Sequence, residues 1–269
     1  RGVEPWLVLD IALWAVPFGI LGGRLYHVAT HPADYFYEGA DLLRIFYVWE
    51  GGLAILGAIS LGAVGAYIGA RSAGLRFSAF ADALAPGLLL AQGIGRTGNY
   101  FNQELFGAPT GLPWGLQIDR PNPAIPVGIP DATLFHPTFA YEMLWNILGA
   151  LVLIWVGRKL SLQWGRVFAL YLVWYGIGRA FLETIRLDPA ELILGVRVNV
   201  WGALAAIALG VILYLHQGFR HPGSEPSAYV PGRQWEPESE VDSSDDYYSV
   251  DDIVGASEKN SGSQGSTTS

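Results

Sequence analysis

The stretch of sequence richest in reactive groups is Gly95–Gly107, where polar residues follow a long apolar run. Arg96 carries a planar guanidinium fork of the kind that binds phosphate, and Asn99 and Asn102 add neutral hydrogen-bonding groups. Glu104 could hold Arg96, orient a hydroxyl group or accept a proton. The competing interpretation is a glycine-rich helix end with solvated side chains. The density of polar groups favours a functional site, because a charge near hydrocarbon needs a partner or a purpose.

A second charged pair, Arg179 and Glu183, is spaced four residues apart. In a helix the two side chains share a face and can form an ion pair, which could equally be a purely structural link within a bundle. Arg186 extends the same face and is better explained as an anchor that reaches the membrane surface. Two arginines, Arg96 and Arg179, would nevertheless suit a lipid phosphate, because paired guanidiniums stabilise the charge that grows on a leaving phosphate oxygen.

His136-Pro137 precedes Tyr141-Glu142 at the start of another apolar segment. His136 is a candidate acid or base. Proline at a helix start and tyrosine at a membrane interface are common without any catalytic role, so the bare sequence leaves both interpretations open.

The residue inventory also excludes some chemistry. The chain contains no cysteine, which rules out disulfides, thiolate metal sites and a cysteine nucleophile, so any thiol in the reaction belongs to the substrate. Its histidines and carboxylates show no metal-ligand spacing, and the P-loop and the serine-hydrolase elbow are both missing. We therefore expect neither a metal nor a cofactor.

Composition indicates the surroundings in which these groups work. Of 269 residues, 51% are hydrophobic and only 15% are charged, well below the roughly 25% charged residues of a soluble domain. The net charge of −8 arises mainly in residues 217–269, which hold ten acidic and three basic residues. The sequence therefore predicts a multi-pass membrane protein, and it has no basic patch for nucleic acid.

The elements that must position the polar groups are six apolar segments of about the length that a bilayer requires. They predict an all-α, multi-pass transmembrane bundle over residues 1–216. The predicted spans are residues 6–29, 49–70, 77–95, 138–157, 167–186 and 197–216.

Orientation follows from the links between these segments. Links 71–76 and 158–166 together hold five basic and no acidic residues, which places both on the cytoplasmic side. The unusual polar residues then all lie toward the outer leaflet. They are Arg24, Glu50, the stretch 96–104, His136, Tyr141, Glu142, Arg179 and Glu183.

The two ends of the chain give further expectations. Residues 217–269 are rich in Ser, Pro, Gly and acidic residues, which predicts a disordered cytoplasmic tail. The chain begins at Arg1 without a methionine, close to an apolar segment, so we expect that the natural N-terminus lies further upstream.

Residues 95–107 match the pattern Gly-Arg-x-Gly-Asn-x-x-Asn-x-Glu-Leu-x-Gly, which resembles the signature of the prolipoprotein diacylglyceryl transferases. The resemblance extends over roughly residues 6–216. Its other stretches are Gly22-Gly23-Arg24-Leu25-Tyr26, Val48-Trp49-Glu50-Gly51-Gly52, His136-Pro137 with Tyr141-Glu142, and Tyr175-Gly176 with Arg179, Glu183 and Arg186.

The resemblance implies seven transmembrane helices in a cell membrane. It implies transfer of the diacylglyceryl group of phosphatidylglycerol to the lipobox cysteine of a prolipoprotein signal peptide, with release of glycerol phosphate. Arg96 corresponds to the family's phosphatidylglycerol-binding arginine and Arg179 to its second essential arginine. The other matched positions are Asn99, Glu104, Gly107 and Glu183, with Arg24, Tyr141, Glu142 and Tyr175 as further substrate-binding candidates.

Two features depart from the family pattern. The histidine proposed as a base in many members corresponds to Leu56, and the family's earlier helix with an important tyrosine is absent from this chain. Proton removal then falls to Glu104, His136 or water. A lipid transporter, or a lipid-phosphate enzyme without a protein acceptor, is the alternative function, and the mass of a lipobox peptide product would separate these alternatives.

Overall fold

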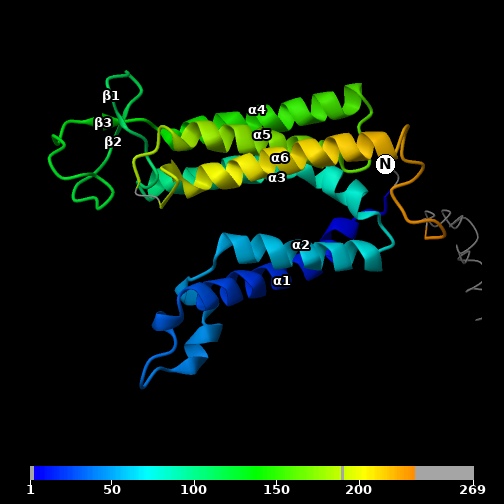
Figure 1. Ribbon diagram of the computed structural model, residues 1–269, viewed down its shortest axis with the longest axis horizontal. Coiled ribbons are helices and arrows are strands. Elements are labelled where there is room, and N and C mark those ends of the chain that lie inside the picture. Colours follow the sequence, from blue (N-terminus) through cyan, green and yellow to red (C-terminus); the bar gives the residue numbers. More distant parts are fainter. Residues whose placement is uncertain (1–2, 189–190, 234–269) are drawn as a thin grey trace, which may run out of the picture. The chain divides into compact units, whose positions relative to one another are not determined.

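The computed structural model describes residues 3–188 and 191–233, and its long elements are α-helices. Within the described chain α1 packs against α2, α3 against α4, and α5 against α6, with α5 also contacting α3 and α4 (Figure 1). The helices are α1 (Leu7–Thr30), α2 (Ile55–Ser72), α3 (Phe77–Phe101), α4 (Thr138–Lys159), α5 (Arg166–Glu183) and α6 (Val198–Arg220).

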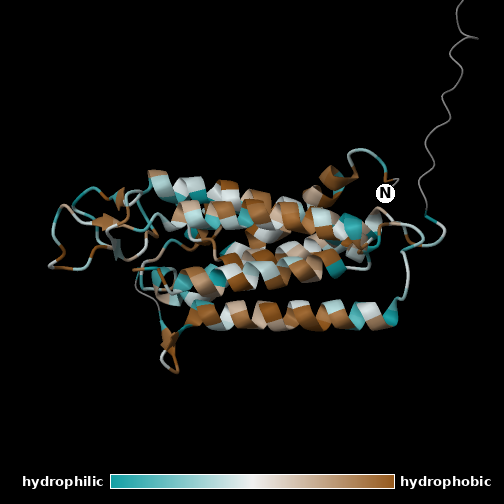
Figure 2. Ribbon diagram, turned by 90° about the horizontal axis from the view of Figure 1, so that it is seen from above, coloured by the Kyte–Doolittle hydropathy of each residue, from teal (hydrophilic) through white to brown (hydrophobic). Residues whose placement is uncertain are grey.

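Five of these helices, α1, α2, α3, α4 and α6, are long and apolar enough to cross a membrane. Large apolar side chains are exposed along them, as on a surface that faces lipid, and Figure 2 shows apolar residues along these helices. The protein is thus a multi-pass helical membrane protein, as predicted. The fifth predicted span, α5, has 18 residues and includes Arg166, Arg179 and Glu183, so its crossing of the membrane stays a prediction.

Glycines set the close approach of α1 and α2. A Cβ added to Gly22 would lie 2.3 Å from the carbonyl oxygen of Gly57, and a Cβ added to Gly57 would lie 2.1 Å from the carbonyl oxygen of Gly22. The two backbones therefore touch directly, which is the packing that small residues permit between membrane helices. Leu56, beside this contact, is 59% exposed.

The predicted start of the second span is wrong. Residues Val48–Glu50 form a short 3-10 helix, η3, and the backbone φ angles of Gly51 and Gly52 are 88° and 71°. That left-handed conformation cannot continue a right-handed helix, so α2 begins only at Ile55. Two further 3-10 helices, η1 (Pro32–Asp34) and η2 (Leu42–Phe46), lie in the same α1–α2 connection.

The predicted end of the third span at Gly95 is also wrong. Helix α3 continues through Phe101, so Arg96 and Asn99 are helical residues. Glycine weakens a helix by only about 1 kcal/mol relative to alanine, which the neighbouring turns readily offset. The first half of the polar stretch is consequently held on a rigid element.

The connection between α3 and α4 contains a small antiparallel sheet, an addition to the predicted all-α architecture. Strands β1 (Pro109–Thr110), β2 (Leu116–Gln117) and β3 (Leu134–Phe135) are ordered β1-β3-β2. Phe106, Ile118 and Phe135 form a core beneath it. A second hairpin, β4 (Leu192–Ile193) and β5 (Val196–Arg197), precedes α6.

The predicted disordered tail begins too early. Helix α6 extends to Arg220, and residues 221–233 fold back on the helices. Tyr229 is 4% exposed, and the Val230 amide donates to the Gly74 carbonyl at 2.8 Å. Burial of an aromatic ring and pairing of backbone groups give this segment the stabilisation that its composition alone did not suggest. The remainder of the predicted tail, 234–269, lies outside the described residues.

Candidate active site

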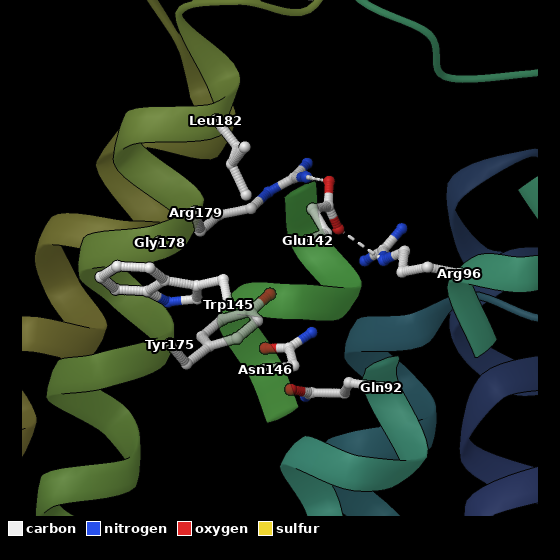
Figure 3. A pocket seen from close by; sticks show the side chains of 9 residues that line it. All are labelled: Gln92, Arg96, Glu142, Trp145, Asn146, Tyr175, Gly178, Arg179 and Leu182. Atoms are coloured by element: carbon white, nitrogen blue, oxygen red, sulfur yellow. Dashed lines mark ion pairs between the residues drawn. The ribbon is translucent and has the colours of Figure 1, made fainter. Parts of the chain in front are cut away.

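Polar side chains spaced three or four residues apart on α3, α4 and α5 converge on one small cavity of about 20 Å³ (Figure 3). This spacing places each set on one face of its helix. Because the three helices contact one another, their polar faces meet inside the protein and away from lipid. The lining residues are Gln92, Arg96, Glu142, Trp145, Asn146, Tyr175, Gly178, Arg179 and Leu182.

Glu142 lies between the two arginines of the cavity. Its Oε2 is 2.5 Å from Nε of Arg96, and its Oε1 is 3.9 Å from Nη1 of Arg179. Figure 3 shows both guanidiniums directed at this one carboxylate. The sequence predicted each of the three residues as part of the site, and the fold brings them together from α3, α4 and α5. The arrangement is a ready anion-binding site that a carboxylate of the protein occupies.

Glu183 forms a second, deeper anionic centre. It is 1% exposed, and its carboxylate contacts Nη2 of Arg179 at 3.1 Å and Nε of Arg197 at 2.8 Å. Asn199 donates to the same carboxylate at 3.0 Å. Because a buried charge is tolerated only when it is well paired, this network fixes Glu183 and, through it, Arg179.

Arg186 belongs to this deeper centre and is not a surface anchor. Its side chain is 5% exposed, its Nε lies 2.7 Å from Asp188, and its Nη1 lies 4.0 Å from Glu183. The interpretation of Arg186 as a residue that reaches for the membrane surface is therefore wrong. Asp188, two residues further along the chain, is the acidic partner that keeps Arg186 inside the protein.

The second half of the polar stretch orients Arg96. Nη1 of Arg96 donates to the side-chain oxygen of Asn99 at 3.3 Å, and the side-chain nitrogen of Asn99 donates in turn to the Glu104 carboxylate at 2.9 Å. Asn102 also donates to Glu104, at 3.2 Å. Glu104 thus holds Arg96 through Asn99, and its exposed carboxylate does not line the cavity.

Gly107 and His136 join the α3–α4 connection to the helix bundle. The Gly107 amide donates to the His136 carbonyl at 2.8 Å, and a Cβ on Gly107 would lie 2.7 Å from Cβ of His136. Nδ1 of His136 is 3.1 Å from the Tyr141 hydroxyl, which accepts a hydrogen bond from Trp114 at 2.9 Å. Gly107, His136 and Tyr141 therefore surround the site without lining its cavity.

Arg24 lies elsewhere. Its guanidinium donates to the carbonyl oxygens of Ile45, Gly51, Gly52 and Arg44 at 2.7, 2.7, 3.2 and 2.5 Å. The residue is 5% exposed and holds the α1–α2 connection in its folded shape. The structure does not bring Arg24 into the cavity with Arg96.

Several residues of the site were not recognised in the sequence. Gln92 lies one turn before Arg96, and Asn146 lies one turn after Glu142, so a search for polar residues at helical spacing would have found both. Gln92 donates to the Tyr171 hydroxyl at 2.9 Å. Arg197 and Asn199 approach Glu183 only through the tertiary fold. Among the described residues no group of side chains could hold a metal ion.

A family model described as prolipoprotein diacylglyceryl transferase matches residues 2–216, which include every residue of the cavity and of the Glu183 network. The chain belongs to this family.

Relatives in the family support the same assignment. A phosphatidylglycerol--prolipoprotein diacylglyceryl transferase of Leifsonia xyli subsp. xyli is 59% identical over 251 residues, covering 90% of this chain and 75% of the relative. Phosphatidylglycerol--prolipoprotein diacylglyceryl transferase 2 of Streptomyces coelicolor is 50% identical over 232 residues, covering 86% and 73%. A phosphatidylglycerol--prolipoprotein diacylglyceryl transferase of Bifidobacterium longum is 48% identical over 241 residues, covering 84% of this chain and 74% of the relative.

Proposed function

We propose that this protein transfers the diacylglyceryl group of phosphatidylglycerol to the lipobox cysteine of a prolipoprotein. The products are a thioether-linked lipid and glycerol phosphate. The observation that carries the proposal is the arrangement of Arg96 and Arg179, whose guanidiniums both contact one anionic group at a cavity between membrane helices. The names of the relatives supply the two substrates.

Phosphate binding uses the arginines in a geometry that favours the reaction. A phosphodiester placed between Arg96 and Arg179 replaces Glu142 as their shared anion. The guanidiniums then lie beside the oxygen that leaves with the phosphate, where negative charge grows during the reaction. In a site enclosed by helices, each such contact is worth more than in water.

The thioether bond of the product identifies which carbon of the lipid the cysteine sulfur attacks. The substrate cysteine reacts as a thiolate, because the thiol is a poor nucleophile. Attack on the glycerol carbon that carries the phosphate ester breaks the carbon–oxygen bond and yields a thioether, whereas attack on an acyl carbonyl would yield a thioester. The basic links 71–76 and 158–166 support a location of this reaction toward the outer leaflet of the cell membrane, where a lipobox cysteine emerges.

The proposal is tested by the mass of the product. The full chain in lipid vesicles is incubated with phosphatidylglycerol and a lipobox peptide, and the peptide is expected to gain one diacylglyceryl group. An unchanged peptide mass contradicts the proposal. Release of phosphate or lipid transport without a mass gain would favour a lipid-phosphate enzyme or a transporter.

The arginine clamp has its own test. Arg96→Lys and Arg179→Lys keep the positive charge and lose the planar fork, so each is expected to lower the transfer rate by at least about 100-fold. Arg44→Lys, at an exposed residue of the α1–α2 connection, serves as the control and is expected to keep the wild-type rate. Near-normal rates in both cavity variants would contradict the clamp.

A further inference from the structure

Glu142 and Glu183 both contact Arg179, yet they are held very differently. Glu183 is fixed by Arg179, Arg197 and Asn199, in the interior between α5 and α6. The carboxylate of Glu142 lines the cavity and contacts the two guanidiniums that the substrate phosphate would need. Of these two carboxylates, Glu142 is therefore the one that substrate binding displaces.

The size of the cavity requires such an exchange. A volume of about 20 Å³ holds roughly one water molecule and is too small for a phosphodiester. Nε of Arg96 already lies 2.5 Å from Oε2 of Glu142. An incoming phosphate must take over these contacts, which leaves the Glu142 carboxylate beside a new anion, with Arg179 still paired to Glu183.

We propose that Glu142 is the general base that removes the proton of the substrate cysteine once the phosphate has taken its place between the arginines. This inference rests on the proposed function. The proton passes from the cysteine sulfur to an oxygen of Glu142, and the sulfur keeps the electron pair. The thiolate forms a carbon–sulfur bond to the glycerol carbon, the carbon–oxygen bond breaks, and its electrons leave with glycerol phosphate.

Charge balance supports this step. The described cluster contains Arg96, Arg179, Arg186 and Arg197 against Glu142, Glu183 and Asp188, which is four positive charges and three negative, a difference of one. A phosphodiester brings one negative charge and balances the cluster. Transfer of the thiol proton to Glu142 then moves a negative charge from the carboxylate to the sulfur, where it is used in the attack. The repulsion between carboxylate and phosphate disappears at the same time.

The other base candidates are less well placed. Leu56 has no proton-accepting atom and is exposed on α2. Glu104 already accepts hydrogen bonds from Asn99 and Asn102 outside the cavity. His136 is hydrogen-bonded to the Tyr141 hydroxyl and does not line the cavity. The polar residues that face Glu142 from the packed helices are Arg96 and Gln92 on α3 and Arg179 and Tyr175 on α5.

The test compares two nucleophiles in the same protein. Glu142→Gln keeps the size of the side chain and removes its ability to accept a proton. With a cysteine lipobox peptide and phosphatidylglycerol vesicles, kcat is expected to fall by about 10²–10⁴-fold, the usual contribution of a general base. KM for phosphatidylglycerol is expected to stay equal or decrease, because the internal competitor for the arginines has lost its charge.

A selenocysteine peptide separates proton removal from positioning. A selenol is ionised at neutral pH and needs no base, so Glu142→Gln is expected to act on this peptide within about tenfold of the wild type. Glu183→Gln, which disturbs Arg179 without touching the proposed proton acceptor, is expected to show no such selective recovery. Both variants use the full chain, and thermal unfolding in detergent confirms that they are folded.

Three outcomes overturn the inference. These are full activity of Glu142→Gln on the cysteine peptide, an equal loss on both peptides, and selenium-specific recovery of His136→Gln in place of Glu142→Gln. Failure of the proposed function is distinct from all three, because the wild-type protein would then add no diacylglyceryl mass to the cysteine peptide.

Discussion

Two arginine regions of this protein differ in what the guanidinium binds. Arg24 donates to four backbone carbonyl oxygens in the α1–α2 connection. Arg96 and Arg179 contact a carboxylate, that of Glu142, at the edge of a cavity. All three were predicted as site residues, Arg96 and Arg179 as a pair suited to a lipid phosphate and Arg24 through the family resemblance.

The difference shows that an arginine of this protein can either be committed to the fold or remain able to bind a substrate. Backbone carbonyls cannot leave a guanidinium without unfolding the loop that carries them, so Arg24 is committed to the fold. A side-chain carboxylate can rotate away when another anion arrives, so Arg96 and Arg179 can accept a substrate. Partners that belong to the backbone therefore indicate a structural role, whereas a carboxylate that lines a cavity, such as Glu142, can give way to another anion.

The largest effect is expected at Glu183, the interior carboxylate that holds Arg179. Glu183→Gln removes the charge that pairs Arg179 and Arg197 in the interior, and breaking such a buried pair costs about 3–5 kcal/mol. We expect a correspondingly lower melting temperature in detergent. Glu191→Gln, at an exposed residue, is the control. An unchanged melting temperature of Glu183→Gln would show that the Glu183 network is as exchangeable as the Glu142 contacts.

A smaller effect is expected from Arg24→Gln. The shorter side chain leaves several carbonyl oxygens of the α1–α2 connection without their donor, which costs about 3 kcal/mol in total. The transfer rate per folded molecule is expected to stay within about threefold of the wild type, since Arg24 contacts no cavity residue. Arg44→Gln is the control for stability. A large fall in kcat with normal stability would place Arg24 in the catalytic machinery after all.

The smallest effects are expected when alanine replaces a closely packed glycine in either region. A Cβ at Gly52 would lie 2.5 Å from Nη1 of Arg24, and one at Gly107 would lie 2.7 Å from Cβ of His136. Each alanine substitution is expected to cost about 1–2 kcal/mol of stability by overpacking, with added backbone strain at Gly52, whose φ is 71°, and only Gly107→Ala should also lower the transfer rate. Gly95→Ala, with nothing within 4 Å of the added Cβ, should be neutral or stabilising in thermal unfolding. Equal losses of activity at Gly52 and Gly107 would erase the distinction between the regions.

The sequence predicted the helices well and their ends poorly. Long apolar segments give α1, α3, α4 and α6 to within a few residues at most boundaries, because hydrocarbon thickness and residue rise fix their length. The errors at Trp49, Gly95 and Gln217 share one cause. At each position local composition predicted one boundary, whereas backbone angles, neighbouring turns or tertiary contacts set a different one.

The residue types alone determined that this chain lies in a membrane and that Arg179 and Glu183 share a helix face, and they predicted that its arginines bind phosphate. Helical spacing is a property of the chain itself, so these conclusions needed no partner element. Only the tertiary structure decided that Glu142 bridges Arg96 and Arg179, that Arg197 reaches Glu183, and that Arg24 is bound by its own loop. Those contacts join residues 14 to 46 positions apart in the chain. Packing between helices sets them, and no local pattern records which polar faces will meet.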